Sequence, residues 1–243
     1  MTHYLGIISA YGTVAILAWL TALLYPRWLP AAPIRTLDHR WRNAALLLVA
    51  FALAYALASF TARGHLLPGD GALASAINLL VILLPVIAYL ALQRSRAAIL
   101  LPQSGIGRSL LVGVAFALCG IAAYFSVRAG RTDMAIPGAP EVVGDALLLT
   151  WRSMLRLLVL AAFLALVIDG WSGKAAIAIA AIAIAATQIP SLLSDGFSPE
   201  WLGILVAHVA LVAGLVSAIV KVRNIVWFWP VLTLLNMLQL YTA

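Results

Sequence analysis

The stretch LLLTWRSMLRLLVLAAFLALVID, residues 147–169, decides the fold class of this chain. It is long and apolar enough to cross the hydrocarbon core of a bilayer, which takes about 20 residues of α-helix. It nevertheless carries Arg152 and Arg156, which lie four residues apart and therefore on one face of a helix. An arginine near the bilayer centre costs roughly 2.5–3.5 kcal/mol on insertion scales, so the pair requires a physical reason.

The composition of the whole chain agrees with a membrane protein. Of its 243 residues, 65% are hydrophobic and only 9% are charged, and the mean hydropathy is +1.08. Soluble domains usually have about 25% charged residues. Cys119 is the only cysteine, which excludes an intrachain disulfide and a cysteine-based metal cluster. The formal net charge of +7 follows from the topology described below and needs no nucleic-acid partner.

Seven further runs resemble the first in length and hydropathy, and together they predict an all-α, polytopic membrane helical bundle of about eight transmembrane helices. The eight runs cover residues 4–25, 43–60, 71–93, 109–127, 146–168, 175–193, 201–220 and 225–241. The connections are short, so we expect residues 1–243 to form a single integral membrane domain. The Ala/Ile-rich residues 176–186 indicate close helix packing through small side chains.

Positive residues are distributed unequally between the two sides that eight consecutive spans define. The connections after the first, third, fifth and seventh runs hold ten of them: Arg27, Arg35, Arg40, Arg42, Arg94, Arg96, Arg108, Lys174, Lys221 and Arg223. The opposite connections hold only Arg63, Arg128 and Arg131. Because Lys and Arg accumulate in cytoplasmic loops, we expect both termini to lie outside the cytoplasm. We place the protein in a bacterial inner (plasma) membrane.

Polar side chains in the last four runs lie at similar depths. With a rise of 1.5 Å per residue, they lie about 8–15 Å from the non-cytoplasmic surface. The set comprises Arg152, Arg156, Gln188, His208, Thr233 and Asn236. We therefore predict a polar membrane cluster that offers the arginines hydrogen-bond acceptors or water.

Each member of this cluster also has a purely structural interpretation. Thr233 can bond its own backbone, His208 can be a packed side chain, and the two amides can join helices through hydrogen bonds. Arg152 can extend to the headgroups. Arg156 lies too deep for that, so we expect Arg156→Leu to lower stability or function and Arg152→Leu to be nearly neutral.

Three motifs follow one another within residues 70–243. They are WRSMLR (151–156), IAATQIP (184–190) and VRNIVWFWPVLTLLNML (222–238). Their order and spacing resemble the CAAX-type intramembrane protease family (CPBP), which includes the type II CAAX prenyl endopeptidases and bacteriocin-processing relatives. The segment 89–114 is similar in style. The resemblance implies a CAAX-protease-like fold with eight helices.

The residues that serve catalysis in that family are missing from the matching positions. Trp151 and Arg152 stand where the family has a glutamate pair, and Thr233 or Leu234 stands at a histidine position. Only Arg156 matches a functional position. Without a carboxylate in the span there is no evident general base, and without clustered His, Asp or Glu we expect no metal and no cofactor.

Three functional hypotheses remain. The leading one is a proteolytically inactive pseudoenzyme that acts as a membrane scaffold or binding partner, with Arg152 and Arg156 holding a carboxylate, a phosphate or an acidic partner helix. The second is an active peptidase with atypical residues, such as His208 with Glu200 or Asp195. The third is a small anion or lipid transporter. The expected partners are the lipid bilayer and another membrane protein or an anionic ligand, with no nucleic acid.

Overall fold

The computed structural model describes residues 2–34, 39–62, 72–93, 96–128, 139–186 and 199–242. Every regular element among them is helical. In chain order the elements are α1 (Thr2–Leu24), η1 (Pro26–Trp28), α2 (Arg40–Ala62), α3 (Ala72–Gln93), η2 (Arg96–Ile99), α4 (Ile106–Arg128), α5 (Ala139–Gly170), α6 (Gly173–Ala186), α8 (Pro199–Val222) and α9 (Phe228–Thr242).

Five of these helices are long and apolar enough to cross a membrane, so the chain is an integral membrane protein. The five spans are Leu5–Leu24, Arg40–Thr61, Leu73–Gln93, Ile106–Arg128 and Ala146–Gly170. Shorter apolar segments occur in α6, α8 and α9. Each of the eight predicted runs overlaps one α-helix, and the largest difference at a helix start is in α5, which begins at Ala139.

The pairwise contacts of six helices form a closed ring. Helix α1 packs against α4 and α8, α4 packs against α9, α9 against α5, α5 against α6, and α6 against α8. The largest hydrophobic cluster lies within this ring and includes Val14 of α1, Leu164 of α5, Ile219 of α8 and Val231 of α9, all nearly inaccessible. Helix α5 therefore lies across the ring from α1.

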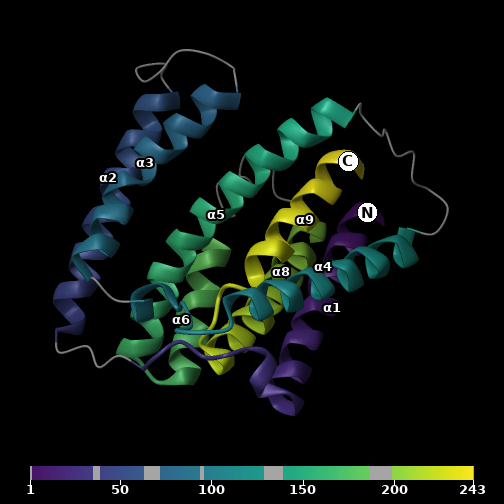
Figure 1. The fold of residues 1–243 in the computed structure, drawn as a ribbon, viewed down its shortest axis with the longest axis horizontal. Helices are drawn as coiled ribbons and strands as arrows, with labels where there is room; N and C mark the ends of the chain where they lie inside the picture. The colour runs from purple at the N-terminus through teal and green to yellow at the C-terminus, as the bar shows by residue number, and fades with distance from the viewer. Residues whose placement is uncertain are drawn as a thin grey trace.

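The remaining two helices, α2 and α3, form a hairpin that packs against α5. Figure 1 shows this pair leaning away from the rest of the bundle. Leu47 of α2 and Val86 of α3 are buried in a second hydrophobic cluster with Ala162 and Leu166 of α5. Helix α5 thus belongs to both parts, with one face in the ring and another against the hairpin.

Small residues allow the closest helix contacts. A Cβ atom at Gly113 of α4 would lie 2.1 Å from the carbonyl oxygen of Trp227. One at Gly120 would lie 3.1 Å from the carbonyl oxygen of Ala10 in α1. In α6, Ala176 and Ala180 are buried, and this helix packs against α8. The close packing predicted from the Ala/Ile-rich run is therefore confirmed for the described part of α6.

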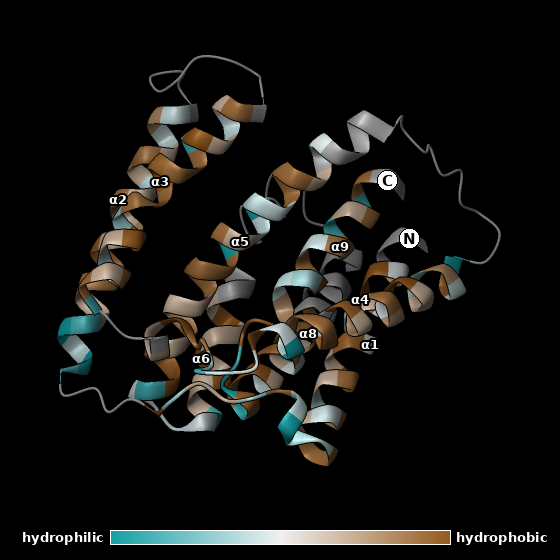
Figure 2. Ribbon diagram, in the orientation of Figure 1, coloured by the Kyte–Doolittle hydropathy of each residue, from teal (hydrophilic) through white to brown (hydrophobic). Residues whose placement is uncertain are grey.

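The two ends of the bundle differ in polarity. Figure 2 shows hydrophobic residues along the helices and hydrophilic residues gathered at the lower end, near the connections α1–α2 and α5–α6. Both termini lie toward the upper right in the same orientation (Figure 1). The positive connections among the described residues thus lie away from both termini.

Candidate functional site

The two arginines of α5 have different surroundings, although they share a helix face. The Nη2 group of Arg152 donates a hydrogen bond to Ser75 Oγ on α3, at 2.6 Å. The indole Nε1–H of the neighbouring Trp151 donates to the carbonyl oxygen of Ala76, at 3.2 Å. These two residues therefore connect α5 to the first turns of α3, and Arg152 does not depend on lipid headgroups for a partner.

Arg156 is exposed in the isolated chain, and no hydrogen bond or ion pair joins it to any residue that the structure describes. It lies ten residues into the span Ala146–Gly170, about 15 Å below the start of that span.

The other predicted members of the polar cluster do not bond to these arginines where their side chains are described. Thr233 of α9 is buried and its hydroxyl has no hydrogen-bond partner, while Asn236 is half-buried on the same helix. Gln188 lies outside the described residues. His208 lies in α8, but its side chain is outside the described part. The structure therefore brings α5 and α9 together without a hydrogen bond among Arg152, Arg156, Thr233 and Asn236.

The contact between α5 and α9 is made by other polar groups. The indole Nε1–H of Trp229 donates to the carbonyl oxygen of Thr150 at 3.4 Å, and Thr150 lies two residues before Arg152. Ser153 lies between the two arginines in sequence, is 1% exposed and has a hydroxyl without a partner in the protein. Among the described residues of this region, Arg156 is thus the charged side chain that is exposed and makes no hydrogen bond or ion pair.

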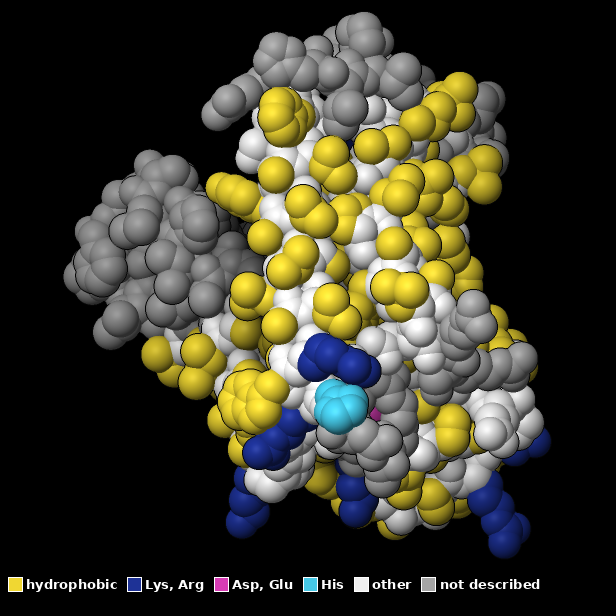
Figure 3. Space-filling view, turned by 90° about the vertical axis from the view of Figure 1, so that its left-hand side faces the viewer, with side chains coloured by type: hydrophobic (Ala, Val, Ile, Leu, Met, Phe, Trp, Pro, Cys, Tyr) yellow, Lys and Arg dark blue, Asp and Glu magenta, His cyan; other side chains and the backbone are white. Residues whose placement is uncertain are grey.

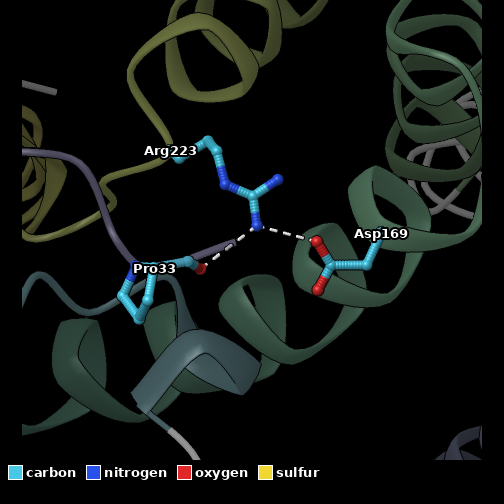
Figure 4. Close-up of polar contacts among 3 residues, drawn as sticks. All are labelled: Pro33, Asp169 and Arg223. Carbon is cyan, nitrogen blue, oxygen red and sulfur yellow. Dashed lines mark hydrogen bonds and ion pairs between the residues drawn. The ribbon is translucent and has the colours of Figure 1, made fainter. Parts of the chain in front are cut away.

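A second polar site occupies the opposite end of α5 (Figure 4). Arg223 Nη2 lies 2.7 Å from Asp169 Oδ1, and the exposed fractions of the two side chains are 17% and 2%. The same Nη2 group donates to the carbonyl oxygen of Pro33 at 3.4 Å. The backbone of Arg223 also accepts a hydrogen bond from the Ala32 amide at 2.9 Å. This ion pair connects the ends of α5 and α8 to the segment between α1 and α2.

The next residue, Asn224, connects three chain segments. Its Nδ2 group donates to the carbonyl oxygen of Pro30 at 2.8 Å and to Ser109 Oγ at 2.9 Å. Its Oδ1 atom accepts the amide of Val226 at 2.9 Å. Asn224 is fully buried, and the adjacent Ile225 amide donates to the carbonyl oxygen of Leu100 at 3.3 Å. The connection between α8 and α9 is therefore joined by hydrogen bonds to Pro30, Leu100 and Ser109.

Sequence reasoning assigned Arg223 only to the positively charged connections, and it did not single out Asp169 or Asn224. An available signal was the polar pair Arg223-Asn224 between two apolar helices, because isolated polar residues beside spanning segments usually have partners. Arg223 and Asn224, the second and third residues of the stretch 222–238, thus hold loops together.

Two further observations bear on chemistry and relatedness. Among the described residues there is no group of three or more His, Cys, Asp or Glu side chains that could hold a metal ion. No family model, curated protein or solved structure matches this chain. The candidate site is therefore characterised by its own geometry, with an exposed arginine in the middle of a membrane-spanning helix at its centre.

Proposed function

We propose that this protein acts by binding within the membrane, as a scaffold or partner subunit, and that Arg156 receives an anionic group of another molecule. The observation that carries the proposal is the exposed Arg156, without a hydrogen bond or ion pair to any described residue, about 15 Å into its span. An ionised group at such a depth is costly, and intramembrane charges usually pair with one another. A counter-charge from a partner offsets that cost.

The chemistry of the partner follows from what this chain lacks. Its eight acidic residues are Asp38, Asp70, Asp133, Glu141, Asp145, Asp169, Asp195 and Glu200, and all lie outside or at the ends of the apolar runs. A second copy of this chain therefore offers no carboxylate at the depth of Arg156. A transmembrane helix with an Asp or Glu near its centre supplies the required charge at the required depth.

Trp151 and Arg152 support a function without proteolysis. In the resemblance to the CAAX-type protease family they stand at the positions of the catalytic glutamates, and here both side chains bond to α3. Neither is a carboxylate that could activate water, so the hairpin contact replaces the catalytic role. We accordingly propose a CAAX-protease-like arrangement that has been retained for binding.

The proposed topology has eight membrane crossings with both termini outside the cytoplasm of a bacterial inner membrane. Support comes from the eight helices that overlap the eight apolar runs, and from the described positive connections that lie away from the termini. The excess of Lys and Arg in those connections favours the cytoplasmic side. Reporter fusions after Arg42 and after Arg108 test the orientation, because both should report a cytoplasmic location.

The binding function is tested with a synthetic transmembrane peptide of about 21 Leu and Ala residues carrying one central Asp. The full-length protein and the peptide are placed in liposomes, and association is measured by fluorescence energy transfer. We expect association with the Asp peptide and much weaker association with a matched Asn peptide. Arg156→Leu should abolish the preference, whereas Arg156→Lys should keep part of it. Equal association of wild type and Arg156→Leu with the Asp peptide would refute the proposal.

A further inference from the structure

An aromatic and basic corner lies where the start of α2 meets the turn between α5 and α6. Arg40 Nη1 donates a hydrogen bond to the carbonyl oxygen of Gly170, at 3.2 Å. The Arg40 guanidinium also lies over the ring of Trp41, 5.5 Å from its centroid. Trp41 and Trp171 meet edge to face, with ring centroids 6.0 Å apart. We call this group, together with His39 and Lys174, the α2–α6 corner.

The charge of this corner is uncompensated by the described part of the chain. His39, Arg40, Arg42 and Lys174 are all exposed. Asp169 precedes Gly170, but it is 2% exposed and is paired with Arg223, so it does not neutralise the corner. Asp169 is the only acid whose side chain the structure describes, and Asp38 lies outside the described residues. Among the described side chains, an anion that approaches this corner therefore meets exposed cations and no exposed carboxylate.

The corner also lies at the boundary of the bilayer. The span of α2 begins at Arg40 and the span of α5 ends at Gly170. Trp is enriched at this level of a membrane, because its ring is apolar and its N–H can be solvated. Figure 3 shows Lys, Arg and His side chains gathered low on this face, directly below a broad apolar surface. In the same helix that begins at this corner, Leu46, Leu48 and Val49 are 45%, 70% and 53% exposed.

We propose that the α2–α6 corner binds the phosphodiester headgroup of an anionic phospholipid, whose acyl chains lie along the exposed apolar face of α2. The ligand must carry a negative head and an apolar tail, because the cations and the apolar surface are contiguous. A soluble anion would contact only the cations, and a zwitterionic lipid would gain only from the apolar surface. Basic sites between helices on the cytoplasmic side suit anionic headgroups in the same way.

A lipid bound here also stabilises the attachment of the hairpin. The Arg40–Gly170 hydrogen bond and the Trp41–Trp171 contact join α2 to the end of α5. A phosphate that contacts Arg40 beside the carbonyl oxygen of Gly170 adds a further link between α2 and the end of α5. Binding of the lipid should therefore raise the melting temperature of the whole protein, which provides the readout.

The test uses the full chain in neutral detergent, titrated with phosphatidylglycerol or with phosphatidylcholine. Binding is followed by native mass spectrometry and by the shift in melting temperature. The variants are Lys174→Gln, Arg40→Gln and their combination. Lys174 makes no hydrogen bond to the described residues, so Lys174→Gln tests the charge without disturbing the fold. Arg27→Gln is the matched control, because Arg27 is an exposed cation of η1 at the foot of α1.

We expect the affinity for phosphatidylglycerol to fall about fivefold for each cation removed, as about 1 kcal/mol per Lys or Arg implies. The affinity of the variants for phosphatidylcholine should stay close to the wild-type value. The affinity of Arg27→Gln for phosphatidylglycerol should also stay close to the wild-type value. Equal binding of the two lipids, or an equal loss in Arg27→Gln and Lys174→Gln, would overturn the proposal. The proposal would also be overturned if inorganic phosphate alone raised the melting temperature as much as phosphatidylglycerol does, since that result would show a site for a free anion.

Discussion

The guanidinium of Arg223 lies 2.7 Å from the carboxylate of Asp169, and this ion pair joins two chain segments that are 54 residues apart. Asp169 belongs to the last turn of α5, and Arg223 follows the last residue of α8. Arg223 has a positive φ of 52°, a conformation that side-chain-bearing residues rarely adopt. With this backbone conformation, the Arg223 side chain contacts Asp169 and its carbonyl oxygen accepts a hydrogen bond from the Ala32 amide.

Removal of one partner of this ion pair should destabilise the protein more than removal of both. Arg223→Gly removes the ion-pair partner of the buried Asp169 carboxylate, which costs up to about 3–5 kcal/mol, although glycine tolerates the positive φ. The double variant Asp169→Leu/Arg223→Gly should recover part of that loss. Unfolding of each variant in nanodiscs, monitored by denaturant titration, measures the coupling. If the loss of unfolding free energy in the double variant equalled the sum of the losses in the two single variants, the two side chains would not interact.

Loss of the Asn224 side chain should loosen the connection between α8 and α9. Asn224→Ala leaves the Pro30 carbonyl and the Val226 amide without their partner, and each unsatisfied buried group costs about 1–3 kcal/mol. The control is Thr61→Ala, because Thr61 bonds only the Leu57 carbonyl of its own helix. We expect a clear fall in melting temperature for Asn224→Ala and little change for the control. A similar small effect in both would argue against a role for Asn224 in holding the loops.

A methyl group at Gly113 should disrupt the contact between α4 and the start of α9. The added Cβ would lie 2.1 Å from the carbonyl oxygen of Trp227, which is a backbone atom and cannot rotate away. Such overpacking costs about 1–3 kcal/mol. Gly107→Ala is the matched control in the same helix, since no atom lies within 4 Å of its added Cβ. Thermal unfolding should separate the two variants, and equal melting temperatures would contradict the close approach.

The two arginines of α5 should respond in opposite ways to replacement by leucine. Arg152→Leu removes the hydrogen bond to Ser75 and should lower the melting temperature of the purified chain by weakening the attachment of α3. Arg156→Leu removes from a spanning helix a charge that has no ion-pair partner among the described residues, and it should stabilise the isolated chain by up to about 3 kcal/mol. Because of the hydrogen bond to Ser75, Arg152→Leu should be the more destabilising of the two variants, whereas depth in the membrane alone predicted that Arg156→Leu would be.

The same Arg156→Leu variant should lose its preference for the acidic transmembrane peptide, so stability and binding change in opposite directions. Melting temperatures in nanodiscs and association in liposomes are compared for both variants. If Arg156→Leu lowered the melting temperature of the isolated chain, the arginine would have a structural partner in this protein. If Arg152→Leu left that temperature unchanged, the contact with α3 would carry little energy.

The sequence by itself determined the helical, membrane-embedded character of this protein. In the core of a bilayer there is no water to hydrogen-bond the backbone N–H and C=O groups. A long apolar run therefore crosses the membrane as an α-helix, which pairs these groups within the segment. The eight runs therefore indicated the helices closely, and the small residues of α6 indicated where helices approach one another. These features depend on local composition and length, which a single sequence displays directly.

Only the tertiary structure decided which polar groups have partners. Arg152 and Ser75 are 77 residues apart, and Arg223 and Asp169 are 54 residues apart. Such pairings depend on the order of helices around the ring, and that order depends on how the shapes of whole helix faces fit together. Depth along a helix placed Arg152 and Arg156 in one layer, but the neighbouring helices bonded one to α3 and left the other exposed, because a helix face is shared among several neighbours.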